Sequence, residues 1–488
     1  MAGIQFPLAH NGRRSTAVFH KAVLAGMAES LSEHDLAQAI RSEEEWRRKY
    51  VGFFDALVKA LHACKDVAQL ASTLRGGLDI ARAVEFEAGS TSGPLARAAP
   101  SVKFQTVRIQ GTGAPKTEFQ LPYEGKRLVG AELESQCDAW AAYGTMETDC
   151  ADAIKKGARR MADLRGRTFL VLGAGAELGP VRQLLEAGAT VAAVATRRRE
   201  RWADLVEFAR CTAGTLLVPV AGEEAPVESD QELAAVAGAD LLAATPAVVD
   251  WLIRCGQEAP GKVTLGTYLY ADGEANLRLT VGADLAASAL ADALGNEKMS
   301  FAYLGSSWTS FAVPAHVIEA QKRHFATAGL FPKIFAKKSA CSKLECEDSF
   351  YFLSNFIVLQ GPNYALAQTL RQWRAVLLHI DGFVVSSPIA PNCRTVNLTR
   401  NPTLATLWKG VAHWAPMETF DPETGRAAML AILLHDLAET PSKKLSSPMQ
   451  LLTRAAFHSG IWRCPFDLRS LGTTTWILGK VRPLRSPL

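Results

Sequence analysis

The stretch Thr168-Phe-Leu-Val-Leu-Gly-Ala-Gly-Ala-Glu-Leu-Gly179 decides how this chain folds. Its first half is an apolar run, its second half holds three glycines, and residues 180–187 then have the composition of a helix. A strand, a tight turn and a helix in that order form a unit of an α/β fold, in which the amides at the helix start can hold a phosphate. Gly173 would permit the turn, Gly175 would let the backbone approach a phosphate, and Gly179 would let helix and strand pack closely.

The next apolar run ends in a cluster of arginines. Residues 190–195 predict a second strand, and Thr196, Arg197, Arg198 and Arg199 follow it directly. At this strand end an acidic residue would bind the ribose hydroxyls of NAD, whereas an arginine suits the extra phosphate of NADP. Together with the glycines, this predicts a dinucleotide site that prefers NADP to NAD. A structural glycine turn followed by a solvated charge run would give the same pattern.

We expect the cofactor to contact the glycine turn, the arginine segment and the end of a later strand. The expected residues are Gly173, Gly175, Ala176, Glu177, Leu178, Gly179, Thr196, Arg197, Arg198 and Thr245. Thr245 belongs to this set because residues 239–245 predict a strand, and the carboxyl ends of strands face the ligand crevice in such sheets.

Strands and helices continue to alternate along this part of the chain. Strands are predicted at residues 104–110, 168–172, 190–195, 215–220, 239–245 and 262–270, and helices at 180–187, 202–209, 231–237 and 247–255. This alternation is typical of a doubly wound parallel sheet.

The predicted fold class is therefore α/β, with a central doubly wound, Rossmann-like parallel sheet. A mainly helical region (1–160) would precede the Rossmann-like region (166–313), and a mixed, mainly helical α+β region (314–488) would follow it.

Residues 166 to about 300 resemble the NAD(P)-binding Rossmann superfamily. Gly175 and Gly179 are similar to part of the GxxxGxG turn of short-chain dehydrogenases, although Val181 stands where the last glycine of that turn would fall. The resemblance implies a catalytic Tyr four residues before a Lys, but no tyrosine of this chain has a lysine at that spacing. The cofactor site, and not the catalytic pair, is what the resemblance supports.

Hydride transfer to a carbonyl or an alkene needs a proton donor near the nicotinamide. Tyr268 and Tyr270 would lie at the end of the strand at 262–270, so we expect them to be the catalytic residues, although aromatic side chains also fill sheet faces. These features favour an NADP-preferring oxidoreductase, a reductase of a small carbonyl or alkene compound. The alternative is a non-catalytic nucleotide-binding or scaffold protein with a degenerate Rossmann domain.

The last region is rich in polar side chains and poor in motifs. Tyr364, Arg371 and Arg374 fall on a predicted helix and could bind an anionic substrate, but long arginine side chains also cover apolar helix surfaces. His316 and His324 lie on another predicted helix, and a lone histidine is more often a packing residue than a base.

Composition limits the kinds of partner that we expect for the chain. With 488 residues and a net charge of +4, it gives no reason to expect a nucleic-acid partner, and no run of apolar residues is long enough for a transmembrane helix. A basic, aromatic segment from Trp462 onward would suit either a membrane surface or packing within the molecule. No Cys and His spacing predicts a metal site, and the oligomeric state stays open.

Nine scattered cysteines fit a reducing compartment, so we expect a cytoplasmic protein. The basic residues 1–27 resemble a transit segment, which leaves mitochondrion or plastid as the alternative.

Overall fold

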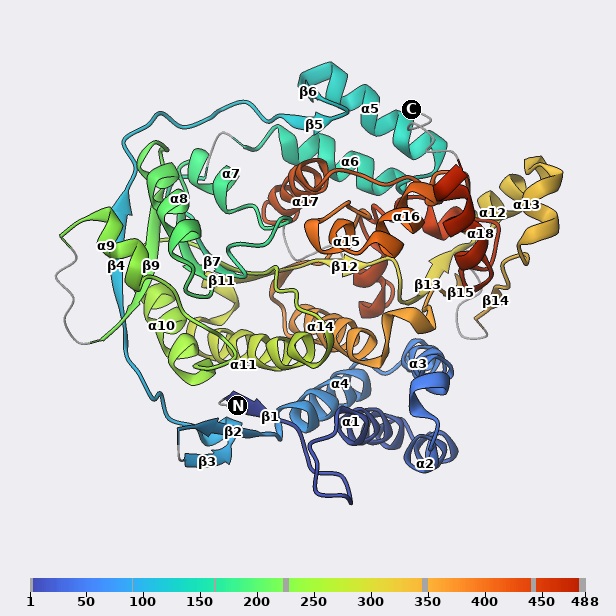
Figure 1. The fold of residues 1–488 in the computed structure, drawn as a ribbon, viewed down its shortest axis with the longest axis horizontal. Helices are drawn as coiled ribbons and strands as arrows, with labels where there is room; N and C mark the ends of the chain where they lie inside the picture. Colours follow the sequence, from blue (N-terminus) through green and yellow to red (C-terminus); the bar gives the residue numbers. More distant parts are fainter. Residues whose placement is uncertain are drawn as a thin grey trace.

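The computed structural model describes residues 3–89, 91–161, 164–222, 228–344, 350–439 and 445–481 (Figure 1). At its centre lies a seven-stranded sheet in the order β16-β11-β10-β7-β8-β9-β4. The strands are β4 (Phe104–Gln110), β7 (Thr168–Leu172), β8 (Thr190–Val194), β9 (Thr215–Ala221), β10 (Val263–Thr267), β11 (Met299–Tyr303) and β16 (Val384–Ser386). Only β4 is antiparallel to its neighbour in this sheet.

The six parallel strands have the order of a doubly wound fold. Numbered among themselves along the chain, they lie as 3-2-1-4-5-6, so the order reverses between β7 and β10. Every residue of β7, β10 and β11 is buried, so none of these strands has a solvent-facing side. The α/β class and the doubly wound sheet predicted from the sequence are confirmed.

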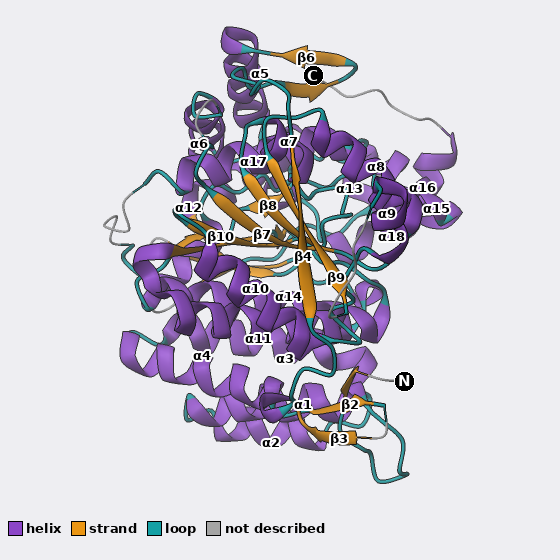
Figure 2. Ribbon diagram, turned by 90° about the vertical axis from the view of Figure 1, so that its left-hand side faces the viewer, coloured by secondary structure: helices purple, strands orange, loops and turns teal. Residues whose placement is uncertain are grey.

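Helices cover both faces of the sheet (Figure 2). One face is packed against α6 (Thr148–Ala158), α7 (Val181–Glu186), α8 (Arg199–Arg210) and α17 (Pro422–Asp436). The other face is packed against α10 (Thr245–Glu258), α11 (Gly273–Lys298) and α14 (Pro362–Ile380). The chain therefore winds its helices onto the two faces in turn, as βαβ connections require.

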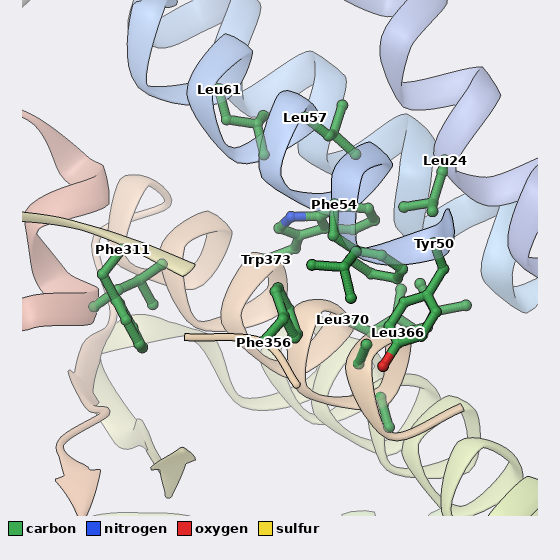
Figure 3. Close-up of a cluster of buried hydrophobic side chains, with 14 of the residues drawn as sticks. Leu24, Tyr50, Phe54, Leu57, Leu61, Phe311, Phe356, Leu366, Leu370 and Trp373 are labelled. Carbon is green, nitrogen blue, oxygen red and sulfur yellow. The ribbon is translucent and has the colours of Figure 1, made fainter. Parts of the chain in front are cut away.

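An N-terminal group of helices forms a further layer on the outside of α14 (Figures 1 and 3). The helices are α1 (Thr16–Ser30), α2 (His34–Ser42), α3 (Trp46–Ala63) and α4 (Val67–Arg82). Leu57 and Phe54 of α3 lie over Leu370 and Trp373 of α14, and all four are buried. One face of α14 is thus fixed by the N-terminal helices while its other face looks toward the sheet.

The remaining elements surround the central sheet. They are β1 (Gly3–Gln5), β2 (Glu85–Ala88), β3 (Thr91–Pro94), η1 (Leu95–Arg97), β5 (Leu121–Tyr123), β6 (Lys126–Leu128), α5 (Gly130–Tyr143), α9 (Asp230–Val236), β12 (Gly305–Ser306), β13 (Ser310–Pro314), α12 (Ala315–Thr327), α13 (Leu330–Phe335), β14 (Ser342–Lys343), β15 (Phe350–Ser354), η2 (Val358–Gln360), β17 (Ile389–Ala390), α15 (Val396–Arg400), α16 (Pro402–Val411), η3 (Pro448–Thr453), η4 (Ile461–Arg463) and α18 (Leu468–Val481). None of the helices in the described ranges combines the length and apolar composition of a membrane span.

The ends of the chain were predicted to carry targeting or surface segments. Residues 16–30 form α1, whose face with Phe19 and Val23 is buried in the N-terminal layer. Near the other end, Trp462 is fully buried, while the basic residues Arg482 and Arg485 lie outside the described residues. Part of the predicted basic, aromatic segment is therefore core.

The predicted strand at residues 239–245 is wrong. Gly238 has a φ of +118°, and the Asp240 carboxylate accepts a hydrogen bond from the Leu242 amide at 2.9 Å, which are features of a turn. Residue 245 then begins α10. The apolar side chains of this segment pack between α10 and the sheet, and the segment does not pair with a strand of the sheet.

Candidate functional site

The glycine turn leaves the central strand β7 at the edge where ligands bind in doubly wound sheets. Gly173 has a φ of +85°, and the amides of Gly173 and Ala174 both donate to the Val194 carbonyl of β8 at 3.0 Å. A Cβ on Gly173 would stand 3.0 Å from the Tyr268 carbonyl. Backbone conformation and close approach therefore both require glycine at this position.

Two tight turns separate β7 from α7. The Ala176 amide donates to the Gly173 carbonyl at 2.9 Å, and the Gly179 amide donates to the Ala176 carbonyl at 3.0 Å. The helix therefore begins only at Val181. The glycines follow the spacing GxGxxxG, one residue longer than the common dinucleotide pattern GxGxxG, and the second turn accommodates the additional residue before the helix begins.

Gly175 is the exposed glycine of the turn. The Nη1 atom of Arg201, on the first turn of α8, lies 3.5 Å from the point where a Cβ of Gly175 would stand. A cation thus lies beside the backbone that a phosphate would approach. Sequence reasoning missed Arg201, which lies inside α8 and beyond the exposed arginines that follow β8.

Glu177 and Leu178 contact the C-terminal part of the chain. The Glu177 carboxylate accepts a hydrogen bond from the Val396 amide at 2.9 Å. The backbone carbonyl of Glu177 accepts another from Arg426 Nη1, also at 2.9 Å. A Cβ on Gly425 would stand 3.2 Å from Leu178. These two residues, predicted to contact the cofactor, therefore hold the turn against α15 and α17.

The arginine segment is exposed at the carboxyl end of β8. Thr196, Arg197 and Arg198 are all exposed, and the two arginines make no ion pair with any residue that the structure describes. The segment's backbone is nevertheless fixed, because the Ala239 amide donates to the Ala195 carbonyl at 2.8 Å. This edge of the sheet therefore presents unneutralised positive charge to solvent.

Thr245 lies inside the protein and not at a strand end. Its side chain is fully buried and its hydroxyl donates to the Leu241 carbonyl at 2.5 Å. A Cβ on Gly282 of α11 would stand 3.4 Å from Thr245. The reason for expecting Thr245 at the cofactor therefore disappears with the strand that was wrongly predicted there.

Tyr268 and Tyr270 both follow β10, as predicted, but their surroundings differ. Tyr268 is buried with its ring folded back over Gly266, and burial raises the pKa of its hydroxyl. Tyr270 is 49% exposed, and its hydroxyl donates to Asp272 at 3.0 Å. Burial and the Asp272 carboxylate raise the pKa of Tyr270, so both phenols keep their protons at neutral pH.

A polar cluster that sequence reasoning largely missed lies at the carboxyl ends of β10 and β11. Thr267 and Tyr303 are paired neighbours at these two strand ends, both buried, and neither hydroxyl has a hydrogen-bond partner among the described residues. Arg371 and Gln368 of α14 lie on the same side of the sheet. Burying a polar atom without a hydrogen-bond partner costs free energy, unless a ligand or a water molecule supplies that partner.

A second constellation joins three segments through one carboxylate. Glu147, just before α6, accepts hydrogen bonds from His316 at 2.7 Å, His458 at 2.8 Å, and Arg463 Nε at 2.9 Å and Nη2 at 2.8 Å. The Gly460 amide donates to His458 Nδ1, so His458 Nε2 carries the proton that Glu147 accepts. No sequence signal links these residues, because the partners are 169 to 316 positions from Glu147.

Hydrogen bonds decide the charge states in this constellation. Burial opposes ionisation of Glu147, but the bonds from both histidines and Arg463 outweigh it and hold its pKa far below the ordinary range. The bond to Glu147 raises the pKa of His316, whereas burial lowers that of His458. The three segments are therefore joined by a buried ion pair supported by two imidazoles.

Among the residues described, no three His, Cys, Asp or Glu side chains gather in a group that could hold a metal ion. Comparison of the chain with known protein families, with curated protein sequences and with solved structures finds no match. The fold and the geometry of the sheet edge are therefore the features that bear on function.

Proposed function

We propose that the chain binds a dinucleotide, NADP in preference to NAD, across the carboxyl edge of its parallel sheet. The observation that carries this proposal is the unpaired arginine segment at the end of β8, beside the glycine turn at the end of β7. In sheets with this strand order, dinucleotides lie across the point where the order reverses. Here that point is between β7 and β10.

We assign the phosphates and the nicotinamide half of the cofactor to different parts of this edge. Gly173 and Gly175 would face the pyrophosphate, and Arg201 would neutralise part of its charge. Arg197 and Arg198 would bind the additional phosphate of NADP, for which a guanidinium is a better partner than a carboxylate. The nicotinamide half would then lie over the ends of β10 and β11.

The reaction we propose is hydride transfer to a small carbonyl or alkene compound. Tyr270, the exposed phenol at the end of β10, would donate a hydrogen bond or a proton to the oxygen or carbon that receives negative charge. The raised pKa keeps the phenol protonated at neutral pH, so Tyr270 would act as a hydrogen-bond donor once its hydroxyl turns from Asp272 to the substrate. Tyr268 would keep β10 and the glycine turn in register through its backbone bond to Leu172.

Titration of the purified protein with NADPH and with NADH, followed by nicotinamide fluorescence, tests the proposal. We expect NADPH to bind more tightly than NADH, and a panel of aldehydes, ketones and enones to reveal turnover. Binding without turnover of any compound would favour the alternative, a nucleotide-binding scaffold, which the absence of a Tyr and Lys pair at family spacing also supports. Failure of both nucleotides to bind would overturn the proposal.

A further inference from the structure

We propose that Arg371 is the binding site for the carboxylate group of a small, singly charged organic anion, held between the ends of β10 and β11 and the helices α11 and α14. The identification of this anion as the substrate rests on the proposed function. The site itself stands on the contacts of the described residues.

Arg371 is a partly buried cation that has no carboxylate partner among the described residues. Its Nη2 donates to Asn276 at 3.1 Å and to Thr280 at 3.0 Å, both neutral side chains of α11. Its Nε is buried and has no hydrogen-bond partner among the described residues. Burial lowers the pKa of Arg371 to about 10, which still leaves the guanidinium charged at neutral pH. A buried charge without a counter-ion is costly, so a ligand that supplies one would bind favourably.

Arg374, on the same helix, is an arginine whose charge is paired with a carboxylate. Arg374 donates through Nε at 2.7 Å and Nη2 at 2.9 Å to the two carboxylate oxygens of Asp284. Both side chains are almost fully buried. Thr280 and Asn276 lie one and two turns before Asp284 on α11, and they face Arg371 in place of an acid. Both arginines fall on the same predicted helix, but Arg374 is paired with Asp284 whereas Arg371 has only neutral partners among the described residues.

Among the described residues, the surroundings of Arg371 supply further hydrogen-bonding groups, and the nearby charges of Arg374 and Asp284 neutralise each other. Tyr303, 5% exposed, has a hydroxyl without a partner, and Gln368, 7% exposed, has a free amide oxygen, among the residues described. The Tyr364 hydroxyl donates to Ser306 at 2.7 Å. One uncompensated positive charge amid neutral groups balances one negative charge, which favours a carboxylate over a doubly charged phosphate.

The position suits a substrate of the proposed reaction. Tyr303 ends β11 and Thr267 ends β10, so the group lies where the nicotinamide half of the cofactor would reach. A carboxylate fixed at Arg371 would orient the carbon skeleton attached to it toward that nicotinamide. The inferred substrate class is therefore a small carbonyl or alkene acid.

Calorimetric titration without nucleotide tests the site. The probes are acetate, pyruvate, 2-oxobutanoate and crotonate, each paired with its uncharged amide, and inorganic phosphate. We expect at least one carboxylate to bind at least about tenfold more tightly than its amide, the size of a charge-assisted hydrogen bond. Binding of phosphate alone, or equal binding of acids and amides, would overturn the proposal.

Two substitutions separate charge recognition from folding. Asn276→Asp adds the missing carboxylate beside Arg371, so we expect a higher melting temperature and loss of carboxylate binding. Arg371→Met removes an unpaired charge, so it should also fold and lose binding. Unchanged carboxylate binding in either variant would refute the site.

The nucleotide titration distinguishes this inference from the proposed function. Loss of carboxylate binding in Asn276→Asp with unchanged NADPH binding supports the site whatever the reaction. If NADPH fails to bind while carboxylates bind at Arg371, the proposed function is wrong and the anion site remains.

Discussion

At the scale of single residues, Glu147 holds together parts of the chain that are far apart in sequence. Replacing it with Gln leaves the buried Arg463 without a counter-ion, so we expect a loss of about 3 kcal/mol in the free energy of unfolding at neutral pH. Urea denaturation measures this loss. The control is Glu134→Gln, whose exposed ion pair with Arg159 should contribute less than about 1 kcal/mol. Equal effects of the two substitutions would contradict this account of Glu147.

The same residue predicts a pH dependence. Because folding lowers the pKa of Glu147 below its ordinary value of 4.5, its contribution to stability is complete above that pH and is lost as the pH falls. The wild-type protein should therefore lose stability more steeply than Glu147→Gln between about pH 5 and pH 2. Denaturation curves at several pH values test this, and parallel curves for the two proteins would exclude the ion pair as the cause.

At the scale of elements, α16 and α18 cross with their backbones in contact. A Cβ on Gly410 would stand 1.9 Å from the Thr475 carbonyl oxygen, and a Cβ on Gly479 would stand 1.9 Å from that of Thr406. We expect Gly410→Ala to force the helices apart and to cost about 2 kcal/mol, measured by urea denaturation. Gly472→Ala, in the partner helix α18 but facing open space, should instead stabilise by up to about 1 kcal/mol. A neutral Gly410→Ala would contradict the close crossing.

The elements also show what sequence patterns can predict. The strand at 104–110 and the apolar runs beginning at residues 168, 190 and 215 were predicted correctly, because each is bounded by a turn signal. β11 was not predicted, since Met299 follows directly on the last residue of α11. The segment 239–245 was mistaken for a strand because apolar composition alone does not distinguish a buried loop from a buried strand.

The candidate site likewise has parts that the sequence predicts and parts that it does not. The glycines and the arginine segment are short-range features of one βαβ unit, so sequence reasoning found them. The open charge of Arg371 depends on which α11 side chains face it across the molecule, and Asn276 is 95 residues away. Only the fold distinguishes Arg371 from the paired Arg374.

At the scale of the whole molecule, the sheet gathers strands from all three predicted regions. β4 comes from the region before residue 160 and β16 from the region after residue 314, and both pair with strands of the central unit. The C-terminal part also contacts the glycine turn through Val396 and Arg426. The proposed cofactor turn is therefore held by the C-terminal part of the chain as well as by the central unit.

The most direct measurement of the central claim compares nucleotide affinities in two charge-matched variants. Arg197→Ala/Arg198→Ala and the control Lys322→Ala/Arg323→Ala, on the exposed face of α12, each lower the net charge from +4 to +2. We predict that only the first pair weakens NADPH, by at least about tenfold, while NADH changes by less than about twofold. Equal weakening of both nucleotides, or equal effects of the two variants, would contradict the assignment of this edge to the phosphate of NADP.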